Sequence, residues 1–304
     1  MVIFVVDLVF LGTGGGMPMP KRFLASMVIK VNGKMVLVDC GEGTQVAMKM
    51  YNSGFKGIDI ICITHCHGDH IIGLSGLLAT MGNSGREEPV TIIGPVGIKK
   101  VVEGLNIVNP YLPYELNIIE NPKEFKKNDF VITTMELEHS SPCIGYKFDF
   151  KRNPMFSVEK AILNNVPRNL WGKLQKEKDI IEFEGKVYKK EMVLGEERKG
   201  ITLSYITDTR PIEEIIPFVE NSDLFVCEGT YGKDEDMEKA IKNKHMTFRE
   251  AAILAKKSNV KELILTHFST AMENPEEYFS NAFEEFKNTI IGEDGLKKEL
   301  KFDD

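Results

Sequence analysis

Residues 64–70 read Thr-His-Cys-His-Gly-Asp-His and hold three of the six histidines of the chain. His65 and His67 stand two positions apart, so in extended backbone their side chains point the same way. Cys66, between them, then points the opposite way. Imidazole nitrogens bind zinc and similar divalent ions. The spacing predicts a metal site that uses the two histidines and leaves the cysteine out.

Asp69 and His70 supply a second pair of donors after a turn at Gly68, where glycine gives the backbone freedom. Two donor pairs offset by a turn suit two neighbouring ions better than one. Nitrogen ligands combined with carboxylates favour zinc, and manganese or iron also accept them. An ordinary surface or core role explains a lone histidine, but it does not explain this concentration of ligands.

The elements around the cluster place it at the end of a sheet. Residues 58–63 form an almost continuous apolar run, as expected of a strand covered on both faces. Apolar residues then recur at helical spacing from Ile71 to Met81, which predicts one helix ending at Gly82. The cluster therefore lies between a strand and a helix, where ligand sites of α/β proteins are usually found.

Further along the chain, predicted strands repeatedly end next to a histidine or a carboxylate. The runs 130–137, 201–206, 224–227 and 263–266 lead into His139, Asp208, Glu228 and His267. If these strands are neighbours, the side chains converge at one edge, as a metal site assembled from distant segments requires.

Asn32-Gly33 between two apolar runs predicts a hairpin. Thr247 to Glu250 matches a capping box ahead of a helix.

Composition sets the broad class. The chain has 304 residues, of which 42% are hydrophobic and 27% charged, so a packed protein is expected. No apolar run approaches the roughly 20 residues that a membrane-spanning helix needs. Five irregularly spaced cysteines argue against a disulfide framework and favour the cytoplasm. The net charge of −7 argues against a generally basic nucleic-acid binder.

Residues 150–200 differ from the rest, because they interrupt the strand pattern with charged, irregular sequence. They hold twelve Lys and Arg residues against eight Asp and Glu residues, together with Trp171, the one tryptophan. A basic segment on an acidic body is either a docking element for a polyanion or a solvated insertion.

The ordered motifs resemble the ribonuclease Z family of the metallo-β-lactamase fold over nearly the whole chain. The matching stretches are Phe10-Leu-Gly-Thr-Gly-Gly-Gly16, Val38-Asp-Cys-Gly-Glu-Gly-Thr-Gln45, His65-Cys-His-Gly-Asp-His70, Thr207-Asp-Thr-Arg210, Glu228-Gly-Thr230 and Leu265-Thr-His-Phe-Ser269. The resemblance implies an α/β fold, a four-layer αββα sandwich formed by residues 1–304 as a single domain. An inserted arm would occupy residues 150–195.

The same resemblance implies two zinc ions and assigns their ligands. His65, His67 and His139 would hold the first ion, Asp69, His70 and His267 would hold the second, and Asp208 would bridge them. Asp69 would also orient or deprotonate the attacking water. His245 resembles the family residue next to the scissile phosphate, although the basic stretch around it also fits a surface histidine.

The activity implied is removal of the 3′ trailer of precursor tRNA by phosphodiester hydrolysis, leaving a 3′-hydroxyl on the tRNA. The arm would grip the tRNA, and the family's usual state is a homodimer. On the substrate side, Arg22 and Thr247 match family positions, and Glu228 would orient His245. Arg22 fits a simple surface charge equally well.

Several substrate-side positions depart from the family pattern, namely Phe23, Asn169-Leu170, Cys227 and Ala271-Met272. The predicted metal ligands do not depart from it. Two alternatives therefore stay open beside precursor-tRNA processing. One is a phosphodiesterase of the same fold that acts on a smaller or different nucleotide, and the other is a non-catalytic relative that binds metal or RNA.

Overall fold

The computed structural model describes residues 5–127, 130–152, 154–176 and 180–302. The chain divides into two compact units. The first contains Met1–Asp149 and Ile201–Lys301, and the second is mainly Phe150–Gly200. All the predicted site residues belong to the first unit, whereas the range predicted for the arm belongs to the second.

The first unit is built on two seven-stranded sheets. One sheet has the order β16-β1-β2-β3-β4-β5-β6. Its strands are β1 (Val5–Gly12), β2 (Ser26–Val31), β3 (Lys34–Val38), β4 (Ile58–Cys62), β5 (Val90–Gly94), β6 (Leu116–Glu120) and β16 (Lys297–Lys301). The predicted hairpin at Asn32-Gly33 is confirmed, because Val31 pairs with Lys34 and both turn residues have positive φ.

The other sheet has the order β15-β14-β13-β12-β9-β8-β7. Its strands are β7 (Glu124–Lys127), β8 (Phe130–Leu137), β9 (Cys143–Arg152), β12 (Arg198–Ile206), β13 (Leu224–Glu228), β14 (Leu263–Thr266) and β15 (Thr289–Ile291). The last four run parallel to one another. Their carboxyl ends therefore meet at one edge, as the sequence predicted.

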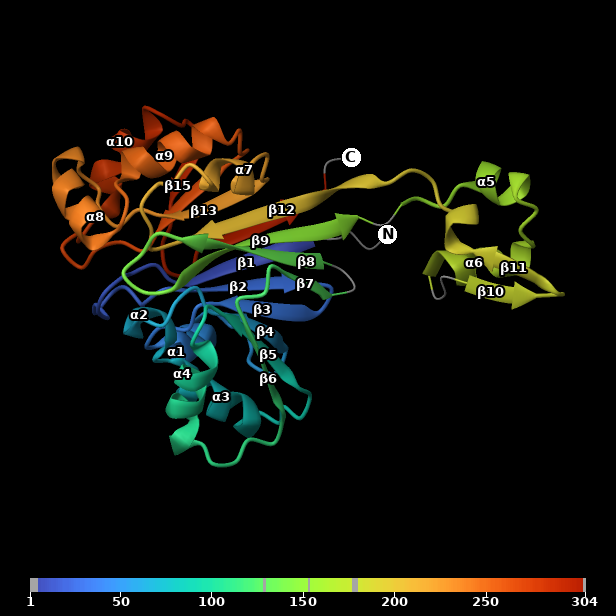
Figure 1. The fold of residues 1–304 in the computed structure, drawn as a ribbon, viewed down its shortest axis with the longest axis horizontal. Helices are drawn as coiled ribbons and strands as arrows, with labels where there is room; N and C mark the ends of the chain where they lie inside the picture. Colours follow the sequence, from blue (N-terminus) through green and yellow to red (C-terminus); the bar gives the residue numbers. More distant parts are fainter. Residues whose placement is uncertain (1–4, 128–129, 153, 177–179, 303–304) are drawn as a thin grey trace. The chain divides into compact units, whose positions relative to one another are not determined.

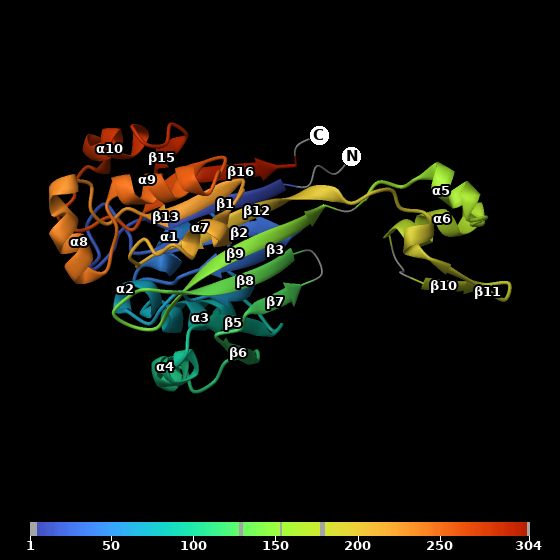
Figure 2. The ribbon, with the colours of Figure 1, turned by 45° about the horizontal axis from the view of Figure 1, so that its top comes forward.

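Helices cover the outer face of each sheet, so the predicted four-layer αββα order is confirmed (Figures 1 and 2). On the first sheet lie α1 (Thr44–Met50), α2 (Gly68–Ile71), α3 (Leu74–Asn83) and α4 (Ile98–Leu105). On the second lie α7 (Ile215–Val219), α8 (Met237–Asn243), α9 (Phe248–Lys257) and α10 (Phe279–Phe283). Short 3-10 turns occupy Asn106–Val108, Asp234–Asp236 and Pro275–Tyr278.

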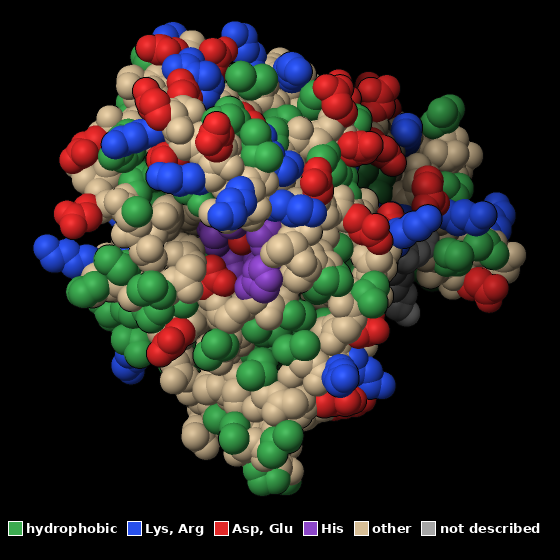
Figure 3. Space-filling view, turned by 60° about the vertical axis from the view of Figure 1, so that its left-hand side comes forward, with side chains coloured by type: hydrophobic (Ala, Val, Ile, Leu, Met, Phe, Trp, Pro, Cys, Tyr) green, Lys and Arg blue, Asp and Glu red, His purple; other side chains and the backbone are tan. Residues whose placement is uncertain are grey.

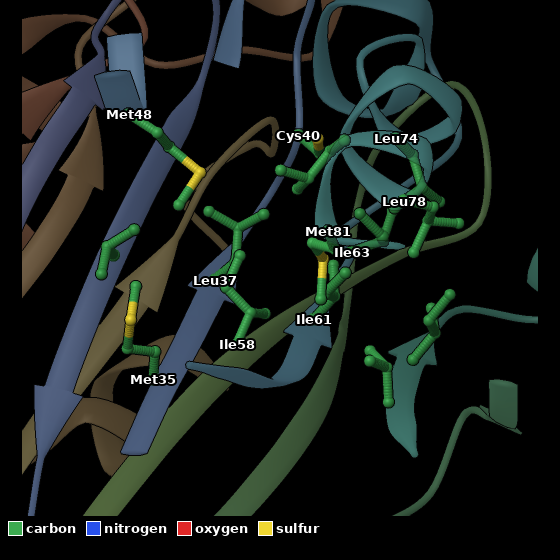
Figure 4. Packing of buried hydrophobic residues seen from close by; sticks show 14 of the residues in the cluster. Met35, Leu37, Cys40, Met48, Ile58, Ile61, Ile63, Leu74, Leu78 and Met81 are labelled. Atoms are coloured by element: carbon green, nitrogen blue, oxygen red, sulfur yellow. The ribbon is translucent and has the colours of Figure 1, made fainter. Parts of the chain in front are cut away.

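The apolar run of β4 is explained by its place inside the sheet. Ile60 and Ile61 point to opposite faces of the strand, yet they are only 1% and 0% exposed. Figure 4 shows Ile61 and Ile63 in the layer between the first sheet and helix α3, near Leu78. Burial on both faces fixes the end of β4, and with it the start of the histidine cluster.

The single helix predicted for residues 71–81 is wrong, because the structure has two helices that meet at Gly73. The Gly73 N–H donates to the carbonyl of Cys40, 2.9 Å away, instead of continuing the helical ladder. A Cβ at this position would lie 2.2 Å from the carbonyl oxygen of Gly41. The loop that contains Cys40 and Gly41, which we call the 40s loop, comes close to Gly73 and breaks the helix. Apolar periodicity does not reveal this break.

The second unit is folded around a core of its own. It contains α5 (Val158–Leu163), α6 (Arg168–Lys176), the hairpin β10 (Ile180–Phe183) with β11 (Lys186–Lys189), and a 3-10 turn at Lys190–Met192. A small apolar core includes Leu170, Leu174 and Val193.

Within the described part of the chain, every helix is too short or too polar to span a lipid bilayer.

Candidate metal centre

Three residues of the centre lie at the ends of strands that have parallel neighbours, and all three have left-handed backbone. Asp39 comes after β3, Asp208 after β12 and His267 after β14, with φ of 57°, 44° and 59°. This conformation costs a non-glycine residue about 1–3 kcal/mol and persists where the surrounding structure enforces it. The turn at each strand end places the side chain next to the histidines of the centre.

The first donor group consists of His65, His67, His139 and Asp208, whose ligand atoms all lie within 4.8 Å of one another. His67 Nδ1 lies 3.0 Å from His65 Nε2 and 3.2 Å from His139 Nε2. Segments more than seventy residues apart thus place three imidazole nitrogens around one point.

The second donor group consists of Asp69, His70 and His267, again within 4.8 Å. The Nε2 atoms of the two histidines are 3.1 Å apart. The Oδ2 atom of Asp69 lies 3.4 Å from His267 Nε2. The structure therefore brings the second predicted ligand set together as well.

Asp208 faces both groups with a different oxygen. Its Oδ2 atom lies 3.6 Å from His65 Nε2 and 3.8 Å from His139 Nε2. Its Oδ1 atom lies 3.4 Å from His70 Nε2 and 3.3 Å from His267 Nε2. This is the arrangement that a carboxylate shared between two ions requires.

The outer nitrogens of two histidines face acceptors of the protein. His70 Nδ1 lies 2.8 Å from Asp39 Oδ2, and His139 Nδ1 lies 3.2 Å from the carbonyl oxygen of Lys244. A proton on each Nδ1 satisfies these acceptors, so the Nε2 lone pairs point into the centre.

Two more of the five ligand histidines, His65 and His267, follow the same rule through threonine hydroxyls. His67 instead turns its Nδ1 atom toward the centre. Thr64 Oγ1 donates to Asp39 and lies 3.2 Å from His65 Nδ1. Thr230 Oγ1 donates to Glu228 and lies 3.0 Å from His267 Nδ1. Since each hydroxyl proton is already used, the imidazole must donate.

Lone pairs that converge at 3.0–3.2 Å repel one another unless a cation lies between them. The carboxylates add negative charge at the same place. Burial alone would raise the pKa of Asp208, but His267, His70 and His65 around it hold that pKa well below its usual range. The donor set therefore fits divalent metal ions.

The glycine-rich loop after β1 supports this centre. The Gly16 N–H donates to Asp69 Oδ2, 2.6 Å away. A Cβ on Gly15 would lie 2.4 Å from the His267 ring. The loop thus holds one ligand by a hydrogen bond and leaves room for another.

Cys66 packs against the apolar cluster under the first sheet, as predicted from its orientation.

His245 stands beside the centre and is held by Glu228. Its Nδ1 atom lies 3.2 Å from Glu228 Oε2. Burial lowers the pKa of His245, but the carboxylates of Glu228 and Asp208 outweigh it and raise that pKa to about 9. The fully buried Glu228 also accepts from the backbone N–H groups of Thr209 and Met246. The predicted contact between these two side chains is therefore present.

The structure gives the predicted substrate-side residues internal partners. Thr247 and Glu228 are both 0% exposed, and the Thr247 hydroxyl caps α9 by accepting from the Glu250 N–H. Such buried side chains act on a substrate only through the groups around them. Arg22 is half-buried, and its guanidinium donates to the carbonyls of Met272 and Glu273 at 2.8 and 3.0 Å. A substrate contact by Arg22 stays a prediction.

Sequence reasoning missed Asp39 and the pair Arg210–Glu250. Arg210 forms a two-point ion pair with Glu250 and donates to the His245 carbonyl. Its own N–H donates to the carbonyl of Glu138, next to His139. Asp39 carried the same signal as the predicted ligands, a carboxylate directly after a strand. Arg210 carried no chemical signal, since its partner lies forty residues away.

The centre opens into a pocket of about 420 Å³, which we call the histidine pocket. It is lined by Gly15, Gly16, His67, Asp69, His139, Ser140, Asp208, Thr230, Tyr231, Lys242, Asn243, His245, His267, Ser269 and Thr270. Figure 3 shows histidine side chains at the base of this hollow and Lys or Arg side chains along one rim. A negatively charged ligand would meet positive charge as it enters.

Two family models match parts of the chain. Residues 6–107 match the family described as anti-Pycsar protein Apyc1, and residues 192–268 match the beta-lactamase superfamily domain. Ribonuclease Z of Clostridium beijerinckii is 61% identical over 306 residues, which cover 98% of this chain and 99% of that protein. The chain belongs to the ribonuclease Z family.

Other members of the ribonuclease Z family and solved structures extend the comparison. Ribonuclease Z of Clostridioides difficile is 54% identical and covers 98% of this chain and 100% of that protein. Human tRNase Z, short form, superposes with a TM-score of 0.68 at 24% identity, covering 96% of this chain and 98% of the human one. The metallo-beta-lactamase fold protein YhfI of Bacillus subtilis gives 0.71 at 19% identity, covering 98% and 100%. These two structures support the fold alone.

Proposed function

We propose that this protein is a zinc-dependent endoribonuclease that removes the 3′ trailer of precursor tRNA and leaves a 3′-hydroxyl on the tRNA. The observation that carries the proposal is a seven-residue donor centre with His245 beside it, in a chain of the ribonuclease Z family. The family supplies the substrate class, and the centre supplies the chemistry.

In this proposal His65, His67 and His139 would hold one zinc ion, while Asp69, His70 and His267 would hold a second. Asp208 would contribute to both sites, because its two oxygens face different donor groups. Zinc at such a site lowers the pKa of water and neutralises charge on a phosphoryl group.

Two side chains of the protein move the protons. Asp69, fixed by the Gly16 N–H, orients the attacking water and accepts its proton. His245 carries a proton because Glu228 stabilises its charged form, and it donates that proton to the leaving 3′ oxygen. Asp69 and His245 both line the histidine pocket, so a phosphodiester bound there can reach both groups.

The second unit is proposed as the arm that binds the tRNA. Its twelve basic and eight acidic residues in 150–200 suit contact with a phosphate backbone. Helical RNA is recognised mainly by shape and backbone, so a basic surface needs no base contacts to select it. By the same family resemblance, we expect a homodimer in the cytoplasm.

The decisive experiment presents the zinc-loaded protein with a trailer-bearing precursor tRNA and, separately, with bis(p-nitrophenyl) phosphate. We expect cleavage of both, with the tRNA product ending in a 3′-hydroxyl. Hydrolysis of the small diester without cleavage of the tRNA would favour a phosphodiesterase for smaller nucleotides. A protein inert on both would favour a non-catalytic relative.

A deletion of residues 155–195 tests the arm. The Gly195 N–H donates to the Met155 carbonyl at 2.7 Å, so the two ends lie together and a short Gly-Ser turn can join them. We expect loss of tRNA cleavage with hydrolysis of the small diester retained. Retention of tRNA cleavage would remove the second unit from substrate binding.

A further inference from the structure

One wall of the histidine pocket takes no part in the roles assigned so far. Tyr231, on the loop after β13, lines the pocket together with Lys242 and Asn243 at the end of α8. None of the three belongs to the donor groups found among the described residues. The wall combines an aromatic ring, a cation and an amide, which is the chemistry of a nucleotide subsite.

The Tyr231 ring is held in place on several sides. Its backbone N–H donates to Met246 and its carbonyl accepts from Phe248, at 3.2 and 2.9 Å. Its hydroxyl accepts from Asn243 Nδ2, 2.6 Å away. A half-buried ring that is already fixed loses little conformational entropy when a ligand stacks on it.

The position of the ring decides which nucleotide it meets. Tyr231 and His245 have ring centroids 6.3 Å apart, with planes inclined at 63°. In the proposed function, His245 stands next to the leaving 3′ oxygen. The side of the pocket beyond His245 must then receive the nucleotide to which that oxygen belongs, which is the last nucleotide kept by the RNA product.

We propose that Tyr231 stacks on the base of this last retained nucleotide, and that Lys242 contacts the phosphate on its 5′ side. Lys242 is exposed at the rim, one residue before Asn243, so its ammonium reaches a backbone that enters along this wall. Stacking tolerates any base, because every base offers a π face. The inference rests on the proposed function and assigns one nucleotide of the substrate to one wall of the pocket.

The test of Tyr231 uses precursor tRNAs with one abasic nucleotide. For the wild-type protein, removing the base of the last retained nucleotide should lower kcat/KM about tenfold, within the range measured for base–aromatic stacking. Removing the base of the first trailer nucleotide should have a smaller effect. Tyr231→Ala should lower kcat/KM on the intact substrate by a similar factor. In this variant, removing the base of the last retained nucleotide should cause no further loss. Tyr231→Phe should restore most of the rate, since it keeps the ring.

A matched control is Tyr111→Ala, because Tyr111 is 81% exposed and does not line the histidine pocket. The Tyr111→Ala variant should cleave the intact precursor, and the precursor without the base of the last retained nucleotide, at the rates of the wild-type protein. A Tyr231→Ala variant that keeps the full abasic penalty, or that cleaves the intact substrate at the wild-type rate, overturns the stacking role. Failure of the wild-type protein on the intact precursor would instead overturn the proposed function.

Lys242 is tested by salt dependence. Lys242→Gln should raise KM for precursor tRNA and reduce the slope of log affinity against log salt by about one, as expected for one lost phosphate contact. Lys239→Gln is the control, because Lys239 lies on the same helix but pairs with Asp236 outside the pocket. An unchanged KM and slope in Lys242→Gln would overturn the phosphate contact.

Discussion

Asp39 Oδ2 lies 2.8 Å from His70 Nδ1, and both side chains are fully buried. The same carboxylate accepts from the hydroxyl of Thr64, whose oxygen in turn faces His65 Nδ1. One carboxylate therefore orients a ring in each donor group. Asp39 is a positioning residue for His65 and His70, although no donor group includes it among the described residues.

Replacing Asp39 by Asn should weaken metal binding about 10- to 100-fold, the usual cost of losing an outer partner of a metal-binding histidine. Asn tolerates the left-handed backbone of this position, so the fold should survive. Competition with a chelator of known affinity measures the effect. Asp7→Asn, in strand β1 of the same sheet, is the control and should bind metal as the wild type does. Equal affinity in the two variants would show that Asp39 does not support the centre.

Replacing His245 by Ala should lower kcat by a factor of about 10²–10⁴, the range for loss of a general acid. Bound metal, measured by elemental analysis, should stay at the wild-type level. The comparison variant His65→Ala should lose metal, since His65 belongs to the first donor group. His245 can also approach Asp208 and His267. If metal were lost with His245, its role would be that of a ligand.

Replacing Arg210 by Lys should lower kcat roughly 10- to 100-fold, because small displacements of a catalytic group have costs of this size. Lysine cannot reproduce the two-point pairing with Glu250 while also donating to the His245 carbonyl. We expect KM to change less than kcat.

The matched control for Arg210 is Arg249→Lys. Arg249 pairs with Asp234, Glu284 and Glu285 at the surface of α9, and it should tolerate the change. Similar losses in both variants would point to general destabilisation of α9. Thermal melting of both proteins distinguishes that outcome from a displaced His245.

Replacing Gly15 by Ala should abolish activity and reduce metal content, because the new methyl group would overlap the His267 ring. Either the His267 ring must move away from Asp69 and His70, or the glycine-rich loop must move and break the hydrogen bond from Gly16 to Asp69. Gly104→Ala, in helix α4 with open space around it, should be neutral or slightly stabilising. An active Gly15→Ala protein would show that the loop can shift without cost to the centre.

The local part of the site can be predicted without any knowledge of the fold. His65, His67, Asp69 and His70 lie within six residues at a strand end, and the strand is visible because burial on both faces makes it apolar. The same logic located His139, Asp208 and His267, since each follows a run of strand-forming residues. Family motifs then joined these segments into one predicted centre.

The outer partners that hold those ligands depend on contacts between distant parts of the chain. Asp39 and His70 are 31 positions apart, and Arg210 and Glu250 are 40 apart, so their pairing depends on how sheets and helices pack. The break at Gly73 likewise comes from the 40s loop, and the folded core of residues 150–200 from contacts between its own helices and hairpin. Periodicity along a chain reports which face is buried, but it does not report what lies against that face. The orientation of the His70, His139 and His267 rings was therefore settled by long-range packing.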